Sequence, residues 1–317
     1  MPVSTPYNSQ EQLLEQGWAA LPASYRMPAT VPTLEQAQAY CQRLTESHYE
    51  NFHVASWFLP KRLRTHFHSI YAYCRIADDL GDEVGNARQS LALLDWWEQQ
   101  LDLCYQGEAR HPVFVALAET VRVCAIPKQP FADLLVAFRQ DQSITRFESM
   151  EQIEQYCRYS ANPVGRLVLY TCGYTDEERF ALSDFTCTGL QLANFWQDVS
   201  VDYKKGRIYL PQQDMDRHEV PEAVIAAGIA TPEFRELMRY EVGHAYRLFG
   251  KGEPLIGMVD RELALDLDLF TQGGLEILRA IEAQGYDVLR TRPVIPKSRK
   301  LRLLLGALMG KFLGRRA

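Results

Sequence analysis

The sequence of 317 residues lacks most features that mark secreted or membrane-spanning proteins. Its seven cysteines form no Cys-x-x-Cys pair, which predicts buried free thiols in a reducing compartment. No signal peptide is recognisable at its beginning. No uninterrupted apolar run approaches the roughly 20 residues needed to cross a bilayer. These absences predict a cytoplasmic protein that does not span a membrane.

Also missing is the alternation of apolar and polar residues, with hairpin turns, that is typical of β-strands. Segments rich in helix formers follow one another instead, separated by clusters of Gly and Pro. The sequence therefore predicts a single all-α domain over residues 32–296, after an N-terminal arm at residues 1–31. Thr33 and Gln36 have the spacing of a capping box at the first helix. The expected helices are 33–49, 62–82, 86–105, 113–125, 130–145, 150–158, 163–172, 176–202, 232–249, 261–283 and 301–313.

The charge is unevenly distributed along the chain. Seven basic residues and no acidic ones lie from Lys297 to Ala317, so removing them from the formal net charge of −6 leaves −13 on residues 1–296. An acidic body argues against nucleic acid as a partner and favours a divalent cation. The basic tail, residues 297–317, has apolar side chains between its charges. It could bind peripherally to the inner face of a membrane or form a last helix on the core.

A first acidic motif reads Tyr71-Ala-Tyr-Cys-Arg75-Ile-Ala-Asp78-Asp79-Leu-Gly-Asp82. In a helix, Asp78 and Asp82 share a face, and Arg75 and Tyr71 extend that face backward. Like charges at this spacing cost a helix a few tenths of a kcal/mol, so the pair needs solvent or a cation. Alone, such a pair is more typical of a solvated helix end than of a metal site.

A second motif changes this interpretation. Asn194, Asp198 and Asp202 recur at a spacing of four residues, and in a helix they share one face. All the implied ligands are oxygen donors, which favours Mg²⁺. Because Mg²⁺ often completes its coordination with substrate phosphate, we expect two such helices to face each other around a diphosphate. The basic residues expected to meet the phosphate are Arg75, Arg166, Lys204, Lys205, Arg207 and Arg292.

With both motifs present, the sequence from about residue 50 to residue 293 resembles the squalene/phytoene synthase family of head-to-head prenyl synthases. The resemblance implies an isoprenoid-synthase helical bundle with a central apolar cavity. It also implies a cluster of two or three Mg²⁺ ions and places Tyr71, Arg75 and Arg292 near the diphosphate. The metal ligands that it implies are Asp78, Asp82, Asn194, Asp198 and Asp202.

Departures from the usual family pattern indicate which reaction of the family to expect. Gln197 stands where the family commonly has Arg, residues 160–165 replace a VAGxVG segment, and Gly273-Gly274 replaces a Tyr. With residues 51–56, these features resemble the hydroxysqualene synthase branch of the bacterial hopanoid pathway, a carbon–oxygen lyase. That branch takes presqualene diphosphate and captures the rearranged carbocation with water. No hydride donor is needed, and no GxGxxG follows a strand, so NADPH is not expected.

The mechanism assigns expected roles to several further side chains. Arg75 and Tyr71 act beside the departing diphosphate. Phe138 and Phe195 are expected to line the apolar wall that holds the cation, although aromatic residues are individually more typical of ordinary core. Asn162 or Gln197 is expected to position the attacking water.

Three alternatives remain open. A neighbouring branch condenses farnesyl or geranylgeranyl diphosphate to presqualene diphosphate, squalene or phytoene. A di-iron carboxylate bundle needs two Glu-x-x-His motifs, but only Glu241-x-x-His244 lies in an expected helix, whereas Glu108-x-x-His111 lies in a Gly–Pro break. A non-enzymatic helical protein on the membrane surface would rely on the tail. The expected partners are a prenyl diphosphate and other enzymes of the squalene route.

Overall fold

The computed structural model describes residues 7–47, 62–296 and 299. Every regular element in these ranges is a helix, which confirms the all-α fold class. The described residues form two compact units. Unit 1 comprises the described residues up to 143 and residues 167–174. Unit 2 comprises residues 144–166 and the described residues from 175 onward. The expected helix at 301–313 and residues 51–56 lie outside the described part. No helix of the described part has the length and hydropathy to cross a membrane.

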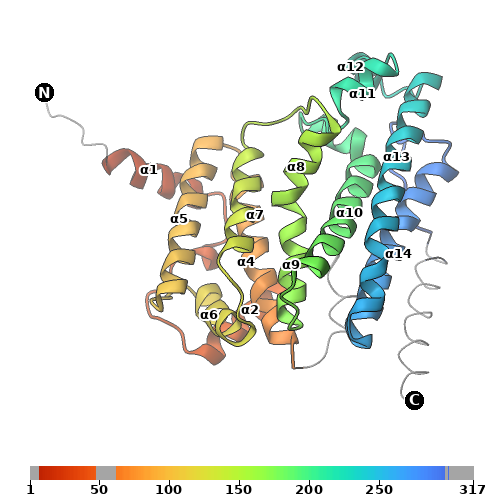
Figure 1. Ribbon diagram of the computed structural model, residues 1–317. Helices are drawn as coiled ribbons and strands as arrows, with labels where there is room; N and C mark the ends of the chain where they lie inside the picture. The colour runs from red at the N-terminus through yellow and green to blue at the C-terminus, as the bar shows by residue number, and fades with distance from the viewer. Residues whose placement is uncertain (1–6, 48–61, 297–298, 300–317) are drawn as a thin grey trace, which may run out of the picture. The chain divides into compact units, whose positions relative to one another are not determined.

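Unit 1 is built around helix α4 (Arg64–Asp82), which contacts α2 (Leu34–Ser47), α5 (Ala87–Gln106), α6 (Pro112–Cys124) and α7 (Gln129–Gln140). Helix α1 (Tyr7–Trp18) packs against α5 and is followed by a short 3₁₀ helix, η1 (Ala23–Tyr25) (Figure 1). Tyr73 of α4 lies in the fully buried core, where its ring stacks on Trp97 at 5.8 Å. Its hydroxyl donates to the Phe131 carbonyl at 2.9 Å.

Local signals explain where several helices begin. The capping box predicted before α2 is confirmed: the Gln36 amide donates to Thr33 Oγ1 at 3.3 Å, and the Thr33 amide donates to Gln36 Oε1 at 2.9 Å. The Asn86 side chain accepts from two amides at the start of α5. Gly107 ends α5 with φ 82°, a left-handed conformation that glycine adopts without steric cost.

Unit 2 is organised by the long helix α10 (Glu177–Lys204), which contacts α8 (Met150–Ser160), α12 (Glu222–Ala227), α13 (Pro232–Gly252) and α14 (Arg261–Ala283). Helices α10, α13 and α14 run side by side (Figure 1). A methyl group on Gly274 of α14 would lie 2.4 Å from Phe249 Cζ. The ring of Phe249 therefore fills the space that a side chain at residue 274 would need. Helix α9 (Asn162–Thr171) contributes residues to both units.

Some elements differ from the sequence expectations. Helices α11 (Gln212–Arg217) and α12 were missed because each has only six residues, too few to show a helical period. Helix α1 and the 3₁₀ helices η1 and η2 (Glu253–Met258) were also missed. The helix expected over 130–145 ends at Gln140, and residues 141–145 are turn and coil.

Candidate functional site

The first acidic motif occupies the last turns of α4. Asp78 is half-buried and Asp82 is exposed, and the helix buries Ile76, Ala77 and Leu80 on its other sides. Burial and, next, the carboxylate of Asp82 raise the pKa of Asp78 to about 6, against the opposing effect of Arg75. The two carboxylates therefore resist being ionised together. A bound cation would remove that penalty.

The neighbouring Asp79, which sequence reasoning left without a role, is the buried acid of this helix. It is only 4% exposed. Arg75 Nε donates to Asp79 Oδ2 at 3.1 Å, and Arg75 Nη2 donates to the other oxygen. The Tyr25 hydroxyl also donates to Oδ2, at 2.6 Å. Arg75 Nη1 lies 3.7 Å from Asp78 Oδ2, so the guanidinium lies between the two carboxylates.

No sequence spacing pointed to Tyr25, since 54 residues separate it from Asp79. Tyr25 lines a cavity of about 490 Å³ in unit 1 together with Arg75, Asp79 and Glu83. Tyr71, one helical turn before Arg75, is half-buried, and burial raises the pKa of its hydroxyl. Tyr71, Arg75 and the acidic pair are thus brought together on one helix.

The second acidic motif lies near the end of α10 in unit 2. Asn194 is exposed, whereas Asp198 and Asp202 are half-buried. Burial and, next, the carboxylate of Asp198 raise the pKa of Asp202 to about 6, and the positive charges of Lys205, Arg207 and Arg292 oppose this shift. Unit 2 therefore repeats the arrangement of unit 1, a carboxylate pair of which one member resists ionisation.

Arg292, from the segment after α14, binds this motif directly. Its Nη2 donates to Asp198 Oδ2 at 3.0 Å, and its Nε donates to Oδ1. The same Nη2 donates to Gln197 Oε1 at 3.0 Å, and Gln197 Nε2 donates to the Pro293 carbonyl at 2.6 Å. Gln197 is buried, and both polar atoms of its amide are engaged. A role for Gln197 in positioning water stays a prediction.

The turn after α10 carries the remaining basic residues of the motif. Gly206 has φ 80°, and the Arg207 amide donates to the Asp202 carbonyl at 2.9 Å, which turns the chain back along α10. Lys204 is exposed and Arg207 is half-buried. Phe195 stacks face to face on Tyr209 with ring centroids 3.8 Å apart. Its proposed place in a cation-binding wall stays a prediction.

The other predicted residues lie elsewhere in their units. Asn162 is buried, and its Oδ1 accepts from the Thr188 hydroxyl at 2.9 Å. Arg166 Nη2 donates to Asp184 Oδ2 at 2.6 Å, so binding substrate would require that ion pair to open. Phe138 is half-buried on α7 in unit 1. None of these contacts tests a substrate role.

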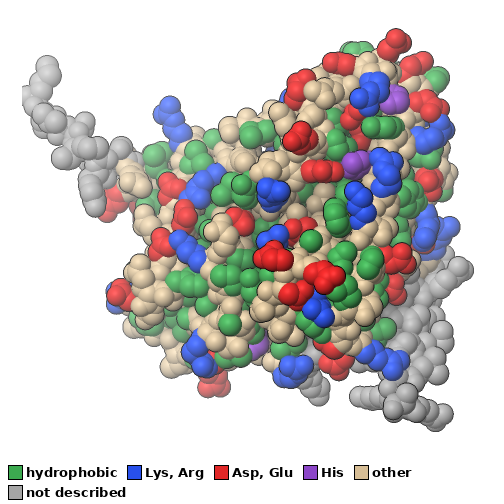
Figure 2. All heavy atoms as spheres, in the orientation of Figure 1, with side chains coloured by type: hydrophobic (Ala, Val, Ile, Leu, Met, Phe, Trp, Pro, Cys, Tyr) green, Lys and Arg blue, Asp and Glu red, His purple; other side chains and the backbone are tan. Residues whose placement is uncertain are grey.

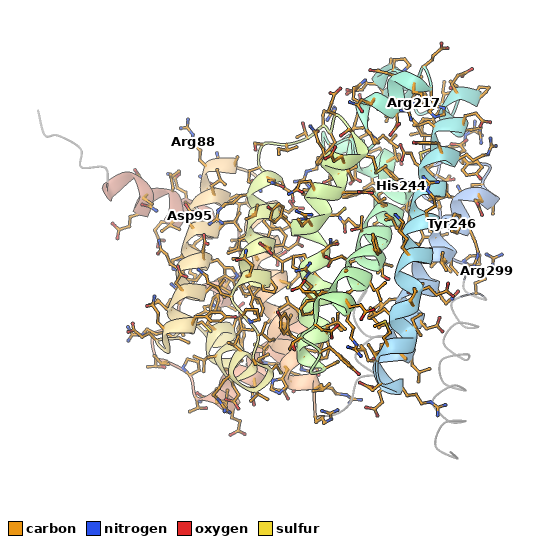
Figure 3. The ribbon with its side chains drawn as sticks, in the orientation of Figure 1. Arg88, Asp95, Arg217, His244, Tyr246 and Arg299 are labelled. Atoms are coloured by element: carbon orange, nitrogen blue, oxygen red, sulfur yellow. The ribbon has the colours of Figure 1, made fainter. Side chains whose placement is uncertain are left out.

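The di-iron interpretation fails for the described part of the chain. No group of three or more His, Cys, Asp or Glu side chains there could hold a metal by itself. His111 caps α6: its Nδ1 accepts from the Val113 amide at 3.3 Å, and its Nε2 lies 3.2 Å from the Tyr25 carbonyl. Burial lowers its pKa to about 4. His244 Nε2 pairs instead with Glu154 Oε1 at 2.7 Å (Figure 3).

Other charged groups of unit 2 are paired at its surface. Acidic, basic and His side chains mix over α11, α12 and α13 (Figure 2). Arg299, the one described residue of the basic tail, donates to Glu276 Oε2 of α14 at 2.8 Å (Figure 3). Ion pairs of this kind are common in folded proteins, contribute little to stability where they are exposed, and do not indicate a second site.

Comparisons with known proteins point to one family. A model of the family described as squalene/phytoene synthase matches residues 45–299. Phytoene synthase from Arthrospira platensis is 28% identical over 292 residues, with 87% of this chain and 93% of that protein covered. The crystal structure of squalene synthase HpnC from Alicyclobacillus acidocaldarius is 43% identical with a TM-score of 0.78, covering 85% of this chain and 98% of that one. A dehydrosqualene synthase in complex with a ligand is 26% identical with a TM-score of 0.79, covering 89% and 98%.

Proposed function

This chain belongs to the squalene/phytoene synthase family, and from that premise we propose that it converts presqualene diphosphate and water to hydroxysqualene and diphosphate. The observation that carries the diphosphate chemistry of this proposal is the repeated arrangement in the two units. Each has a carboxylate pair with one pKa raised to about 6, and an arginine bonded to or beside that pair. The identity of 43% to squalene synthase HpnC, against 28% to the phytoene synthase from Arthrospira platensis, favours the hydroxysqualene branch over the phytoene synthases.

The donor set fits Mg²⁺, which the proposal requires. Oxygen ligands without His or Cys suit a hard cation. Among the described residues, no group of three or more His, Cys, Asp or Glu side chains could hold a metal by itself. Substrate phosphate would supply the missing ligands. When bound, Mg²⁺ would neutralise charge that develops on the departing diphosphate. The residues that would hold Mg²⁺ are Asp78 and Asp82 in unit 1 and Asn194, Asp198 and Asp202 in unit 2.

The remaining steps fall to the side chains of the chain itself. Arg75 and Arg292 donate to the diphosphate as the carbon–oxygen bond breaks and its electron pair leaves with oxygen. Aromatic rings, Phe138 and Phe195 among them, attract the rearranging carbocation from an apolar wall. Water then attacks the cation through its oxygen, which Asn162 or Gln197 would orient, and its proton passes to the released diphosphate. The balance of this reaction needs no reductant.

Product identification tests the proposal most directly. Purified protein is incubated with Mg²⁺ and either presqualene diphosphate or farnesyl diphosphate, without NADPH, and the organic products are identified by mass spectrometry. We expect hydroxysqualene from presqualene diphosphate and no consumption of farnesyl diphosphate. Consumption of farnesyl diphosphate as sole substrate would contradict the proposal. Asn162→Ala or Gln197→Ala should change the ratio of alcohol to hydrocarbon products, and an unchanged ratio would remove both from the water site.

A second candidate within the family is the condensation of farnesyl or geranylgeranyl diphosphate to presqualene diphosphate, squalene or phytoene. The phytoene synthase relatives favour it, although at lower identity than HpnC. Incubation with geranylgeranyl diphosphate distinguishes it, because only this alternative predicts phytoene. In either reaction the substrates carry long hydrocarbon chains. We therefore propose that the basic tail brings the enzyme to an anionic membrane surface. There its products would pass to other enzymes of the route. Flotation with liposomes, with and without residues 297–317, tests this.

A further inference from the structure

Tyr25 is a buried tyrosine whose hydroxyl faces the acidic motif of α4. Its side chain is 2% exposed, and its hydroxyl donates to Asp79 Oδ2 at 2.6 Å. The proposed reaction uses Asp78 and Asp82 of this motif and assigns nothing to Asp79 or Tyr25. A buried hydroxyl on a buried carboxylate therefore needs a separate explanation.

Asp79 links Tyr25 to Arg75. A carboxylate that is 4% exposed has lost most of its hydration and must recover it from donors in the protein. Arg75 donates to both Asp79 oxygens, and Tyr25 adds a further donor to Oδ2. Because a guanidinium is planar, a contact to both oxygens fixes the plane of the arginine. The free edge of that plane, at Nη1, lies 3.7 Å from Asp78 Oδ2.

The segment that carries Tyr25 is itself held in place. The Val113 amide donates to His111 Nδ1 at 3.3 Å, so the proton of the neutral ring is on Nε2. That nitrogen donates to the Tyr25 carbonyl at 3.2 Å. Tyr40 donates its hydroxyl to the Ser24 carbonyl at 2.8 Å. Tyr25 thus starts from a fixed backbone, and its hydroxyl can in turn hold Asp79.

We propose that Tyr25 is a positioning residue that, through Asp79, sets the guanidinium of Arg75 beside Asp78 in the orientation that receives a diphosphate. Without the Tyr25 hydroxyl, Asp79 lacks one donor and can draw Arg75 out of this plane. This inference rests on the proposed function, since it requires a diphosphate at Arg75.

Tyr25→Phe tests the inference, and Tyr40→Phe is its matched control. Each variant removes one tyrosine hydroxyl. The Tyr25 hydroxyl donates to Asp79, whereas the Tyr40 hydroxyl donates to the backbone carbonyl of Ser24, the residue before Tyr25. We expect Tyr25→Phe to raise both the KM for presqualene diphosphate and the Kd for Mg²⁺ pyrophosphate about tenfold, because hydrogen bonds to charged groups have this strength. Its kcat should stay within about twofold. Tyr40→Phe leaves the contact of His111 with the Tyr25 carbonyl in place, so it should change each of the two constants by less than about twofold. Equal effects of the two variants would overturn the inference.

A double-mutant cycle separates positioning from a general loss of stability. If Tyr25 acts through Asp79, the Tyr25→Phe/Asp79→Asn variant should bind Mg²⁺ pyrophosphate no more weakly than Asp79→Asn alone. Effects that multiply would overturn the inference. If circular dichroism shows that Tyr25→Phe does not fold, a second cycle combines Asp79→Asn with Arg75→Lys. If their effects on the binding of Mg²⁺ pyrophosphate multiply, Asp79 does not act through Arg75 and the inference is overturned.

Calorimetry with Mg²⁺ pyrophosphate keeps the two proposals distinguishable. Wild-type protein that binds Mg²⁺ pyrophosphate but converts no presqualene diphosphate would overturn the proposed function, and the binding constants of the variants would still decide the role of Tyr25. Conversion of presqualene diphosphate with unchanged constants in Tyr25→Phe would overturn the role of Tyr25 alone.

Discussion

The two acidic helices obtain their arginines in different ways. On α4 in unit 1, Arg75 belongs to the helix itself and is bound to Asp79, which is not among the proposed metal ligands. For α10 in unit 2, Arg292 lies 94 residues after Asp198 in the sequence and is bound to it, and Asp198 is one of the proposed metal ligands. Arg75 can therefore stay in place when a cation binds, whereas Arg292 must release Asp198 at least in part. The comparison indicates that the two arginines play different parts.

The comparison predicts, first, that the two carboxylate pairs are equally indispensable. Asp78→Asn and Asp198→Asn should each lower kcat/KM by about 10²–10³-fold, since each removes a charge that holds the cation at the leaving group. Steady-state kinetics with presqualene diphosphate measures this. Asp133→Asn is the control, because that carboxylate is half-buried on α7, accepts from Gln129 Nε2 at 2.7 Å and belongs to neither acidic motif. Folded variants with parental rates would show that the motifs do not bind metal.

The second prediction concerns the difference between the two arginines. Arg75→Lys and Arg292→Lys should each lower kcat/KM by about tenfold or somewhat more, because lysine keeps the charge but not the paired hydrogen bonds. Only Arg292→Lys should also lower the Mg²⁺ concentration needed for half-maximal activity, since it weakens a competitor for Asp198. Titration of activity with Mg²⁺ measures this. Identical Mg²⁺ requirements in the two variants would mean that the difference in their contacts has no functional consequence.

These arginines also illustrate what the sequence can reveal. Arg75 shares a helical face with Asp78 and Asp82, so spacing alone placed it correctly. Arg292 was among the basic residues expected to meet the phosphate, but no local pattern connects it to Asp198, and only the family resemblance singled it out from the other basic residues. Tyr25 and His111 carried neither signal, since their contacts depend on how a segment without a period packs on α4 and α6. Local periodicity predicts which residues share a helix face, and long-range contacts remain beyond it.

A third prediction compares two helix glycines, one in each unit. Gly274→Ala in unit 2 should destabilise the fold by about 1–3 kcal/mol, the usual cost of overpacking, because the new methyl would lie 2.4 Å from Phe249 Cζ. Gly81→Ala in unit 1 meets nothing closer than Gln142 Nε2 at 3.5 Å. It should be neutral or stabilising by up to about 1 kcal/mol, since alanine favours helix. Thermal unfolding of both variants checks the contrast, and an equal loss in each would refute it.

The last prediction concerns how each unit treats a buried acid. Asp79 in unit 1 has donors from Arg75 and Tyr25, whereas Glu241 of α13 in unit 2 is fully buried and neither of its oxygens accepts a hydrogen bond from the described residues. Burial and, next, the carboxylate of Asp214 raise the pKa of Glu241 from its ordinary 4.5 to about 9, against the weaker effects of Arg217 and Arg247. At neutral pH Glu241 is therefore protonated.

Between pH 4.5 and pH 9 the folded protein holds a proton on Glu241 that the unfolded chain has released. Stability should therefore fall as pH rises through this window, by up to about 1.4 kcal/mol per pH unit. Glu241→Gln keeps a neutral group of the same size and should flatten that dependence, as measured by urea unfolding at pH 6, 7 and 8. Glu233→Gln, on the exposed first turn of the same helix, should leave the slope unchanged. If the free energy of unfolding of Glu241→Gln depends on pH as steeply as that of the wild type, the dependence arises from other groups. The buried Glu241 of unit 2 would then contribute no more to it than the buried Asp79 of unit 1.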